Sequence, residues 1–205
     1  MSEHYFSEHP QSQSEPHSLH AILRGRELTF FTDHGVFSRR GIDEGTRLLI
    51  ESMPSLATGT LLDLGCGYGA IGIALAVASP DLRVSMVDIN ARAVELALRN
   101  AVLNRVERRV DAAQGDGFDA LPASALFDTI ALNPPIRAGK QVIFRLYEEA
   151  YARLRGVGRL FVVIRKQQGA ESSEKRLREI GFAVNVVAKD KGYRVFSCSK
   201  QHISD

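Results

Sequence analysis

TLLDLGCGYGAIGIALAVAS, at residues 60–79, is the stretch that decides the fold. Its apolar start, Thr60–Gly65, predicts a short buried strand, and its alanine-rich end, Ala70–Ser79, predicts a helix. The glycines between them allow a sharp turn, because glycine adopts backbone conformations that other residues avoid, and they let a ligand approach the main chain closely. A strand, a glycine-rich turn and a helix in this order predict a ligand-binding turn at the end of a strand.

The spacing of these glycines, GxGxG, differs from the GxGxxG of dinucleotide dehydrogenases, which directs a pyrophosphate to the helix N-terminus. Asp63 lies two residues before the first glycine, where its carboxylate would repel a pyrophosphate and attract a cationic amino-acid group. The turn therefore disfavours a nicotinamide oxidoreductase and indicates a ligand that carries a positive charge.

Strand-like and helix-like segments alternate after this turn. Strands are predicted at residues 83–89, 109–114, 127–133 and 158–166, and helices at 91–104, 140–154 and 170–180. Alternation of this kind predicts an α/β fold with a mostly parallel sheet and helices on both faces. Only Lys189–Gly192 separate the last two strands, Ala183–Ala188 and Tyr193–Ser199, and so short a connection requires the last strand to run antiparallel to its partner.

The first 54 residues carry weaker signals. Residues 1–18 are polar and predict a flexible arm. Residues 19–32 predict a β-hairpin that turns at Arg24–Arg26, and Asp43–Met53 predict a helix with Asp43 as N-cap. We expect one domain over residues 19–205, with the hairpin and helix at 19–54 and the binding core at 55–205. The histidines near the amino terminus fit no familiar metal-ligand spacing: His4, His9, His17 and His20.

The composition is that of a globular protein, since 44% of the 205 residues are hydrophobic and 24% are charged. The net charge of +2 is compatible with a nucleic-acid partner without being diagnostic of one. The two cysteines, Cys66 and Cys198, form no CxxC pair, so neither a zinc site nor a disulfide framework is indicated. No segment has the character of a signal peptide or a membrane span, and we expect a cytoplasmic protein.

Two further acidic residues follow the next strands, at the same edge of the predicted sheet. Asp88 ends the second strand, where a carboxylate binds the hydroxyls of a ribose in other doubly wound nucleotide folds. Asp116, between two glycines after the third strand, is placed to accept a hydrogen bond from an adenine amino group. Turn preference explains each aspartate singly. Their joint occurrence with Asp63 at one edge predicts a ligand that contains a nucleoside.

The tetrapeptide Asn133-Pro134-Pro135-Ile136 follows the fourth strand. Its prolines end the strand and fix the chain, because proline donates no hydrogen bond to a ladder. The Asn133 side-chain oxygen and the Pro134 carbonyl would accept the two hydrogens of an exocyclic amine. They would hold its nitrogen near tetrahedral and aim the lone pair at a methyl carbon, and such orientation contributes roughly 7–11 kcal/mol. The turn therefore predicts transfer of a methyl group to an amine without a metal.

Several separated motifs resemble those of class I S-adenosylmethionine-dependent methyltransferases. DLGCGYGAIGIALA and NPPI are similar to the glycine-rich and NPP motifs of that superfamily. GVFSRRGIDEGTRLLIE, NPPIRAGK, IRKQQGA and KGYRVF resemble the methyltransferase small domain family, which includes guanine-N2 methyltransferases of small-subunit ribosomal RNA. The resemblance runs from about Leu19 to Lys200. It implies S-adenosylmethionine as cofactor, ribosomal RNA or the small ribosomal subunit as partner, and a doubly wound, seven-stranded Rossmann-like sheet with an N-terminal hairpin. The implied strand order, counted from the strand at Thr60, is 3-2-1-4-5-7-6.

The resemblance also implies the site residues. The cofactor is expected to contact Phe37, Asp63, Gly65, Cys66, Gly67, Asp88, Ile89, Asp116, Gly117 and Asn133. The acceptor amine is expected at Asn133, Pro134, Pro135 and Ile136. Many amino-methyltransferases have Tyr or Phe after the NPP motif, where the ring stacks on the target base, and Ile136 departs from that pattern.

Basic side chains supply the candidate RNA contacts: Arg24, Arg26, Arg39, Arg40, Arg137, Lys140, Arg165 and Lys166. Arg137 and Lys140 directly follow the catalytic turn and are the two predicted to bind RNA phosphates. A second basic group, Arg105, Arg108 and Arg109, predicts a solvated helix end.

The predicted reaction is methyl transfer to an exocyclic amine, with guanine N2 of small-subunit ribosomal RNA favoured. An adenine-N6 nucleic-acid methyltransferase would share the chemistry. So would a protein glutamine-N5 methyltransferase, which usually has Tyr after the NPP motif and a helical recognition domain. A non-catalytic module would bind S-adenosylmethionine without turnover, although intact Asp63, Asp88 and Asn133 argue against it. The substrate form, free RNA or assembled particle, and the oligomeric state stay open.

Overall fold

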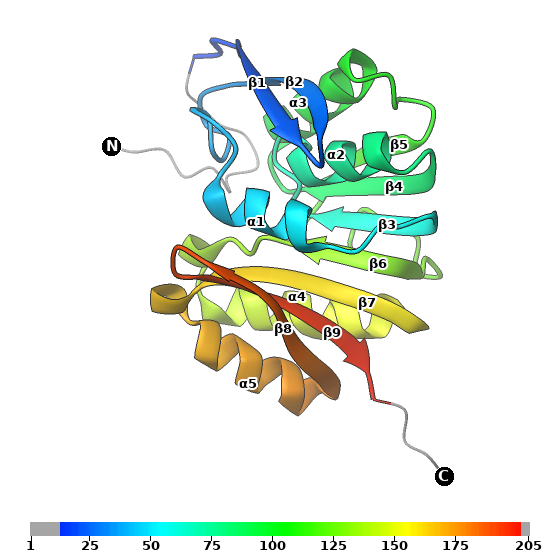
Figure 1. The fold of residues 1–205 in the computed structure, drawn as a ribbon, viewed down its shortest axis with the longest axis vertical. Coiled ribbons are helices and arrows are strands. Elements are labelled where there is room, and N and C mark those ends of the chain that lie inside the picture. Colours follow the sequence, from blue (N-terminus) through cyan, green and yellow to red (C-terminus); the bar gives the residue numbers. More distant parts are fainter. Residues whose placement is uncertain (1–12, 202–205) are drawn as a thin grey trace.

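A seven-stranded sheet forms the centre of the computed structural model, which describes residues 13–201. The strands are β3 (Thr58–Leu64), β4 (Asp81–Asp88), β5 (Val110–Gln114), β6 (Phe127–Leu132), β7 (Leu154–Arg165), β8 (Phe182–Asp190) and β9 (Tyr193–Lys200). Their order is β5-β4-β3-β6-β7-β9-β8 (Figure 1). Counted from β3, this is the predicted order 3-2-1-4-5-7-6, which is confirmed.

The direction of the last strand is also confirmed. Strands β3 to β7 pair in parallel, and β9 runs antiparallel to both β7 and β8. The loop between β8 and β9 is shorter than predicted, because β8 continues to Asp190 and leaves only Lys191 and Gly192. Their φ angles of 45° and 81° are the positive pair that a two-residue hairpin turn of type I′ requires.

Helices cover both faces of the sheet (Figure 1). On one face lie α1 (Glu44–Ser52), α2 (Ala70–Ala78) and α3 (Ala91–Leu103), and on the other α4 (Lys140–Arg153) and α5 (Ala170–Ile180). Neighbouring residues of β3 pack into different cores: Leu61 packs with α1–α3, and Leu62 packs with α4 and α5. The central strands β3, β6 and β7 end in apolar, buried stretches because both faces of the sheet are covered there. None of the described helices is long and apolar enough to cross a membrane.

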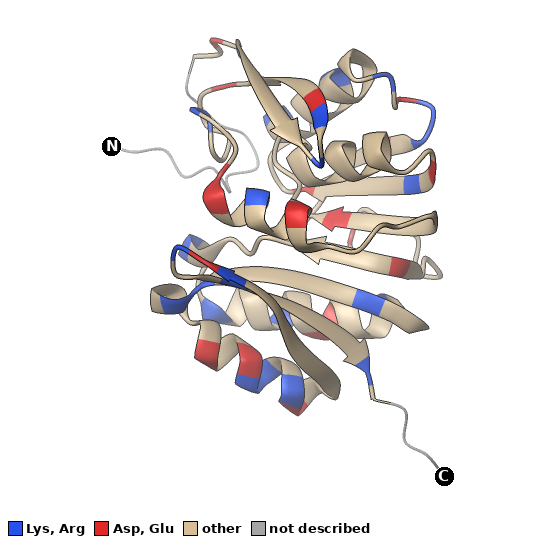
Figure 2. Cartoon of the chain, in the orientation of Figure 1, with Lys and Arg blue, Asp and Glu red and all other residues tan. Residues whose placement is uncertain are grey.

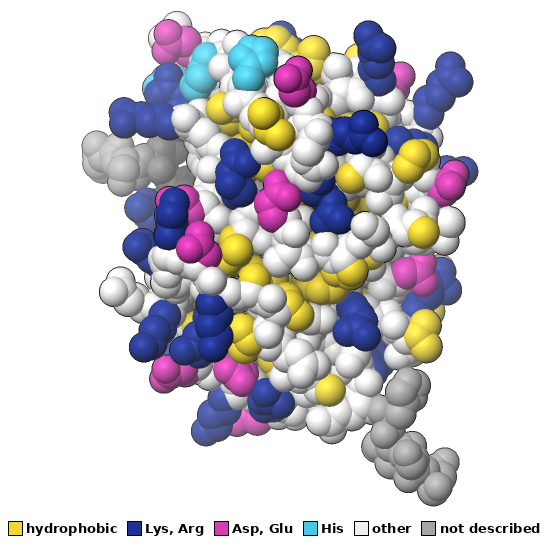
Figure 3. Space-filling view, viewed as in Figure 1, with side chains coloured by type: hydrophobic (Ala, Val, Ile, Leu, Met, Phe, Trp, Pro, Cys, Tyr) yellow, Lys and Arg dark blue, Asp and Glu magenta, His cyan; other side chains and the backbone are white. Residues whose placement is uncertain are grey.

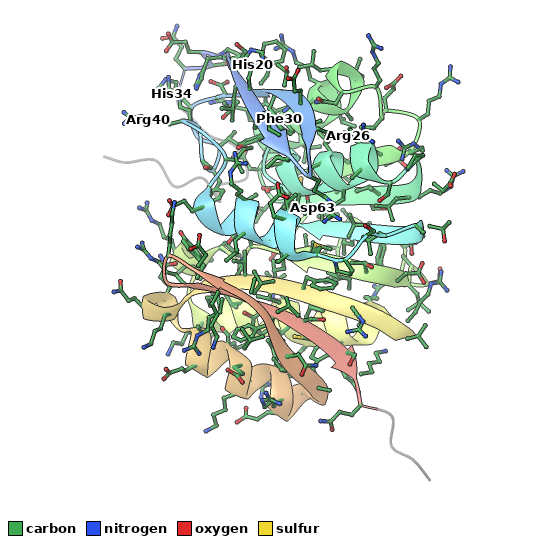
Figure 4. All side chains as sticks on the ribbon, viewed as in Figure 1. His20, Arg26, Phe30, His34, Arg40 and Asp63 are labelled. Carbon is green, nitrogen blue, oxygen red and sulfur yellow. The ribbon has the colours of Figure 1, made fainter. Side chains whose placement is uncertain are left out.

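The predicted N-terminal hairpin consists of β1 (His17–Leu23) and β2 (Arg26–Thr32), paired antiparallel apart from the large sheet. Strand β1 begins two residues before the predicted boundary at residue 19. Residues 1–12, with His4 and His9, lie outside the described residues. The buried side chains of Leu23 and Phe30 anchor the hairpin in the core under α1–α3 (Figure 4).

Asn100 of α3 and Asn104, the C-cap of that helix, bind the outer backbone edge of β2. Asn100 Oδ1 accepts from the Phe31 amide at 2.6 Å, and Asn100 Nδ2 donates to the Phe31 carbonyl at 2.9 Å. Asn104, one helical turn later, makes the same pair of bonds with Thr29, at 3.2 and 2.8 Å. Each side-chain amide therefore takes the place of a neighbouring strand, and the hairpin edge is satisfied without joining the sheet.

Two of the basic residues have structural roles that the sequence interpretation missed. Arg24 Nη1 donates to the carbonyls of Ile50 and Met53 at the end of α1, both at 2.8 Å. The Arg109 guanidinium donates to three carbonyls in and beyond the last turn of α2, at 3.0–3.1 Å. Both cations neutralise the negative end of a helix. Arg24 is therefore not a free RNA contact, and the prediction of a solvated end at Arg109 is wrong.

Candidate active site

A pocket opens where β3, β4, β5 and β6 end, at the edge marked by the arrowheads of β3 and β6 in Figure 1. Its volume of about 350 Å³ suits a small-molecule ligand. Most of the predicted site residues line it: Phe37, Gly65, Cys66, Gly67, Asp88, Ile89, Asp116, Gly117, Asn133, Pro134 and Pro135. The other predicted site residues lie within the described part of the chain but outside this lining: Asp63, Ile136, Arg137 and Lys140.

The glycine turn forms one wall of the pocket and is held by β4. The amides of Gly65 and Cys66 both donate to the carbonyl of Val87, at 2.8 and 3.0 Å. Gly65 and Gly67 have φ angles of 70° and 55°, which side chains rarely adopt. A Cβ on either glycine would meet no atom of the described residues within 4 Å. The turn therefore presents bare backbone to open space, as close approach of a ligand requires.

Asp63, labelled in Figure 4, is fully buried near the end of β3 and is not among the residues that line the pocket. One carboxylate oxygen accepts from the Gly72 amide of α2 at 2.8 Å, and the other has no hydrogen-bond partner among residues 13–201. Burial, with a smaller contribution from the Asp88 charge, raises the pKa of Asp63 to about 7. An unpaired buried acceptor is costly, so this oxygen would gain from a hydrogen-bond donor brought by a ligand.

Asp88 lines the pocket at the end of β4, as predicted. Its Oδ2 accepts from the Gly67 amide at 2.8 Å, and its Oδ1 accepts from the Asn90 amide at 2.9 Å. Burial raises its pKa, and these backbone bonds oppose the shift. Because a carboxylate offers about four acceptor sites, Asp88 keeps capacity for a ligand hydroxyl while the glycine turn and the residues before α3 hold it in place.

Asp116 lines the pocket but is already paired. Its Oδ1 accepts from Arg145 of α4 at 2.6 Å, and Arg145 also donates to Glu149 at 3.3 Å. Arg145 is a lining residue that the sequence interpretation missed, because a charged residue in a predicted surface helix is usually solvated. The ion pair leaves Asp116 one unshared oxygen for an adenine amino group and makes Arg145 part of that wall.

Phe37 reaches the pocket on the loop between β2 and α1. Asn90 and Arg92 at the start of α3 hold this loop, because their side chains donate to the carbonyls of Gly35 and His34 at 2.7 and 2.8 Å. Asn90 also caps α3 as predicted, accepting from the amides of Arg92 and Ala93. The loop before α1 therefore forms part of the pocket lining and is held there by the start of α3.

Asn133 leaves β6 at the mouth of the pocket, followed by the buried Pro134. Its side-chain nitrogen donates to Asp43 Oδ2 at 3.2 Å and to Thr46 Oγ1 at 2.9 Å, both at the start of α1. Ile136 begins the short 3-10 helix η1 (Ile136–Ala138) and packs against the core under α4 and α5. It therefore supports the turn from behind.

A family model described as the methyltransferase small domain matches residues 27–197. The chain belongs to this family. The match confirms the predicted family and, with it, S-adenosylmethionine as the cofactor.

Three relatives of this methyltransferase small domain are informative. The uncharacterized protein YbxB of Bacillus subtilis is 42% identical over 201 residues, which are 98% of this chain and all of that protein. Ribosomal RNA large subunit methyltransferase G of Ectopseudomonas mendocina is 32% identical over 93% of this chain and 52% of its own length. The solved structure of the T. thermophilus 16S rRNA N2 G1207 methyltransferase (RsmC), in complex with AdoMet and guanosine, has a TM-score of 0.83. It is 29% identical and covers 92% of this chain and 52% of its own. The chain thus spans about half the length of the two ribosomal RNA methyltransferases.

The pocket of this methyltransferase small domain fits S-adenosylmethionine. The negative charge of Asp63, buried next to the glycine turn, suits a cationic amino group in the pocket, and Asp88, which lines the pocket, suits the ribose hydroxyls. The bare turn at Gly65 and Gly67 leaves room for the methionine part, and the wall of Asp116 and Arg145 lies where the adenine would end. These residues lie at the ends of β3 and β4, in the turns after β3 and β5, and on α4, which the sheet brings to one edge.

Proposed function

We propose that this protein transfers the methyl group of S-adenosylmethionine to an exocyclic amine of a base in ribosomal RNA, with N2 of guanine as the favoured acceptor. One observation carries the proposal: Asn133 and Pro134 lie at the mouth of a pocket that fits the cofactor. The relatives named for ribosomal RNA methylation support the RNA, and the one solved with AdoMet and guanosine supports the base.

The chain's own residues would supply orientation. The bound cofactor provides a methyl group that its sulfonium already activates. Asn133 Oδ1 and the Pro134 carbonyl would each accept a hydrogen bond from one N–H group of the acceptor amine. The two bonds would turn the lone pair of the nitrogen toward that methyl carbon. The prolines keep both oxygens in place, and the same two acceptors would stabilise the positive charge that develops on the nitrogen. As the nitrogen–methyl bond forms, the sulfonium–methyl bond would break and S-adenosylhomocysteine would leave, and the nitrogen would then lose one proton to solvent.

The surface around the pocket suits a polyanion. Arg137 and Lys140 are exposed shortly after the catalytic turn, and Arg165 and Lys166 are exposed at the end of β7. Figure 2 shows Lys and Arg in the loops at this edge, Figure 3 shows dark blue side chains along the same margin, and Arg40 projects there in Figure 4. Cations on both sides of the pocket mouth would bind the phosphates that flank a target nucleotide. A base in a duplex would have to flip out, so an unpaired target is favoured.

The experiment is transfer of labelled methyl from S-adenosylmethionine to unmodified small and large ribosomal subunits and to their naked RNA, followed by nucleoside mass spectrometry. N2-methylguanosine in small-subunit RNA is the expected product. N6-methyladenosine would identify adenine as the target base and leave the proposed chemistry unchanged. Label in protein alone would contradict the proposal that RNA is the substrate. If the protein binds the cofactor but transfers methyl to no substrate, it is a non-catalytic module that binds S-adenosylmethionine.

The catalytic role of the NPP turn has its own test. Asn133→Ala is expected to lower the rate of transfer by at least about 10²-fold, because the acceptor amine loses one of its two orienting oxygens. The Kd for S-adenosylmethionine is expected to change less than about threefold. Turnover close to that of the unsubstituted protein would contradict the mechanism.

A further inference from the structure

We propose that Asp43 and Thr46 are positioning residues, which together turn the side-chain amide of Asn133 so that its oxygen faces the acceptor amine. The inference rests on the proposed function, since it names the residues that orient Asn133 for methyl transfer. It concerns a contact across 90 positions of sequence, between the start of α1 and the end of β6.

The local structure of α1 places both residues. Asp43 is the N-cap, and its Oδ2 accepts from the Thr46 amide at 2.9 Å. This bond closes the first turn of α1. Asn133 Nδ2 lies within 3.2 Å of Asp43 Oδ2 and within 2.9 Å of Thr46 Oγ1. The two hydrogens of the amide nitrogen therefore have one acceptor each.

Hydrogen-bonding capacity decides which way the amide of Asn133 points. An asparagine side chain has a donor end and an acceptor end of nearly equal shape, so its orientation follows from its neighbours. An ionised carboxylate accepts and never donates. If the amide were reversed, its oxygen would face Asp43 Oδ2 with no hydrogen between them. The nitrogen must therefore face α1, and Asn133 Oδ1 is left to face away, into the pocket that Asn133 lines.

The surroundings hold Asp43 itself in place. Gly45 is buried because the ring of Tyr193, at the start of β9, lies over it: a Cβ on Gly45 would be 2.7 Å from Tyr193 Cε1. Burial and the Asp43 charge raise the pKa of Tyr193, so its phenol stays neutral near that carboxylate. Arg165 stands 5.6 Å from the centre of the same ring. The GIDEGT and KGYRVF segments of the sequence thus meet at one carboxylate.

Variants can separate orientation from helix capping. Serine caps helices as well as aspartate does, but its shorter side chain does not reach Asn133, so Asp43→Ser keeps the cap and removes the acceptor. Thr46→Val keeps the shape of the side chain and the Asp43–Thr46 backbone bond and removes the hydroxyl. Thr46→Ser restores the hydroxyl. Glu44→Gln is the matched control, because Glu44 is exposed between the two positions and pairs only with Lys191 among the described residues.

Two measurements test the inference. The first is methyl transfer at saturating RNA and cofactor, with the Kd for S-adenosylmethionine and the unfolding midpoint measured alongside. The second is the side-chain amide signal of Asn133 in ¹⁵N–¹H spectra of the ligand-free protein, identified by its loss in Asn133→Ala. We expect kcat to fall about 10-fold in Thr46→Val and about 10²-fold in the double variant Asp43→Ser/Thr46→Val. Cofactor Kd should stay within about threefold, and Thr46→Ser and Glu44→Gln should stay within about twofold in kcat. The amide protons of Asn133 should lose protection from exchange in the double variant.

A double variant with unchanged kcat and an unchanged Asn133 signal would overturn the inference. So would a loss of kcat that follows a matching loss of cofactor affinity and stability, since that is what a purely structural role produces. Failure of the proposed function looks different: the unsubstituted protein would methylate no RNA base. In that case the spectra of the ligand-free variants still decide whether Asp43 and Thr46 orient the amide.

Discussion

Replacing Asn100 by alanine should remove a large part of the stability of this protein. Asn100 is fully buried, and its amide makes three hydrogen bonds, to the Phe31 amide at 2.6 Å and to the carbonyls of Phe31 and Tyr68, both at 2.9 Å. Asn100→Ala leaves all three backbone groups without that partner. An unpaired buried polar group costs about 1–3 kcal/mol, and partial exposure of Phe31 favours the lower half of that range. We therefore expect a loss of about 3–6 kcal/mol, against a typical total of about 5–15 kcal/mol.

Urea denaturation of the ligand-free protein measures this loss, with Asn104→Ala as the matched control. Asn104 lies one turn later on the same helix and bonds Thr29 in the same way, but it is half-exposed, so water replaces its hydrogen bonds. We expect the control to cost about 1 kcal/mol, the usual net value of a hydrogen bond. A loss below about 1 kcal/mol in Asn100→Ala, or one no larger than in Asn104→Ala, would refute the reasoning.

The same substitution should weaken cofactor binding. The Tyr68 carbonyl belongs to the glycine turn that lines the pocket, and Asn100 ties that turn to the hairpin. Under conditions where Asn100→Ala remains folded, we expect the Kd for S-adenosylmethionine to rise several-fold, whereas Asn104→Ala should bind normally. Calorimetric titration of both variants at low temperature checks this result.

Three further predictions concern charged groups. Because the pKa of Asp63 is raised to about 7 from its ordinary value near 3.8, the folded protein keeps a proton that the unfolded chain has released. Stability of the ligand-free protein should therefore fall as pH rises from about 4 to 7, and the affinity for the cationic cofactor should rise through pH 7. Asp63→Asn should reduce the dependence on pH of both the stability and the cofactor affinity. If urea denaturation and binding curves of this variant vary with pH as they do in the unsubstituted protein, the effect does not come from Asp63. Arg145→Ala removes the cation that fixes Asp116 and forms part of the pocket wall, and it should raise the cofactor Kd up to about fivefold, the value of an exposed ion pair, so an unchanged Kd would remove Arg145 from the site. Arg109→Ala should cost about 1–3 kcal/mol in urea denaturation, since it uncaps α2, and a change below about 0.5 kcal/mol would return Arg109 to the solvated class.

Local signals in the sequence determined the layout of the site. Hydrophobic periodicity located every strand and helix of the core, and the short connection before β9 required its direction. The helix caps at Asp43 and Asn90 were predicted because a cap depends on residues two or three positions away. The glycine turn and Asp88 were predicted to lie at one edge of the sheet, because the carboxyl ends of parallel strands meet at the same edge.

Pairings between distant residues were decided by the tertiary structure alone. Asn100 is a poor helix former by propensity, and nothing within its helix shows that its amide stands in for a strand beside Phe31, 69 positions away. The sequence predicts Arg24 and Arg109 to be surface cations, and only the folded chain shows that they bind the ends of α1 and α2. The sequence also predicted an oxygen of Asn133 for catalysis but not the partners at α1 that turn it. Periodicity and turn chemistry act over a few residues and are visible in order along the chain. The partner of a buried polar group depends on which segments packing brings within about 3 Å, and only the folded chain sets that.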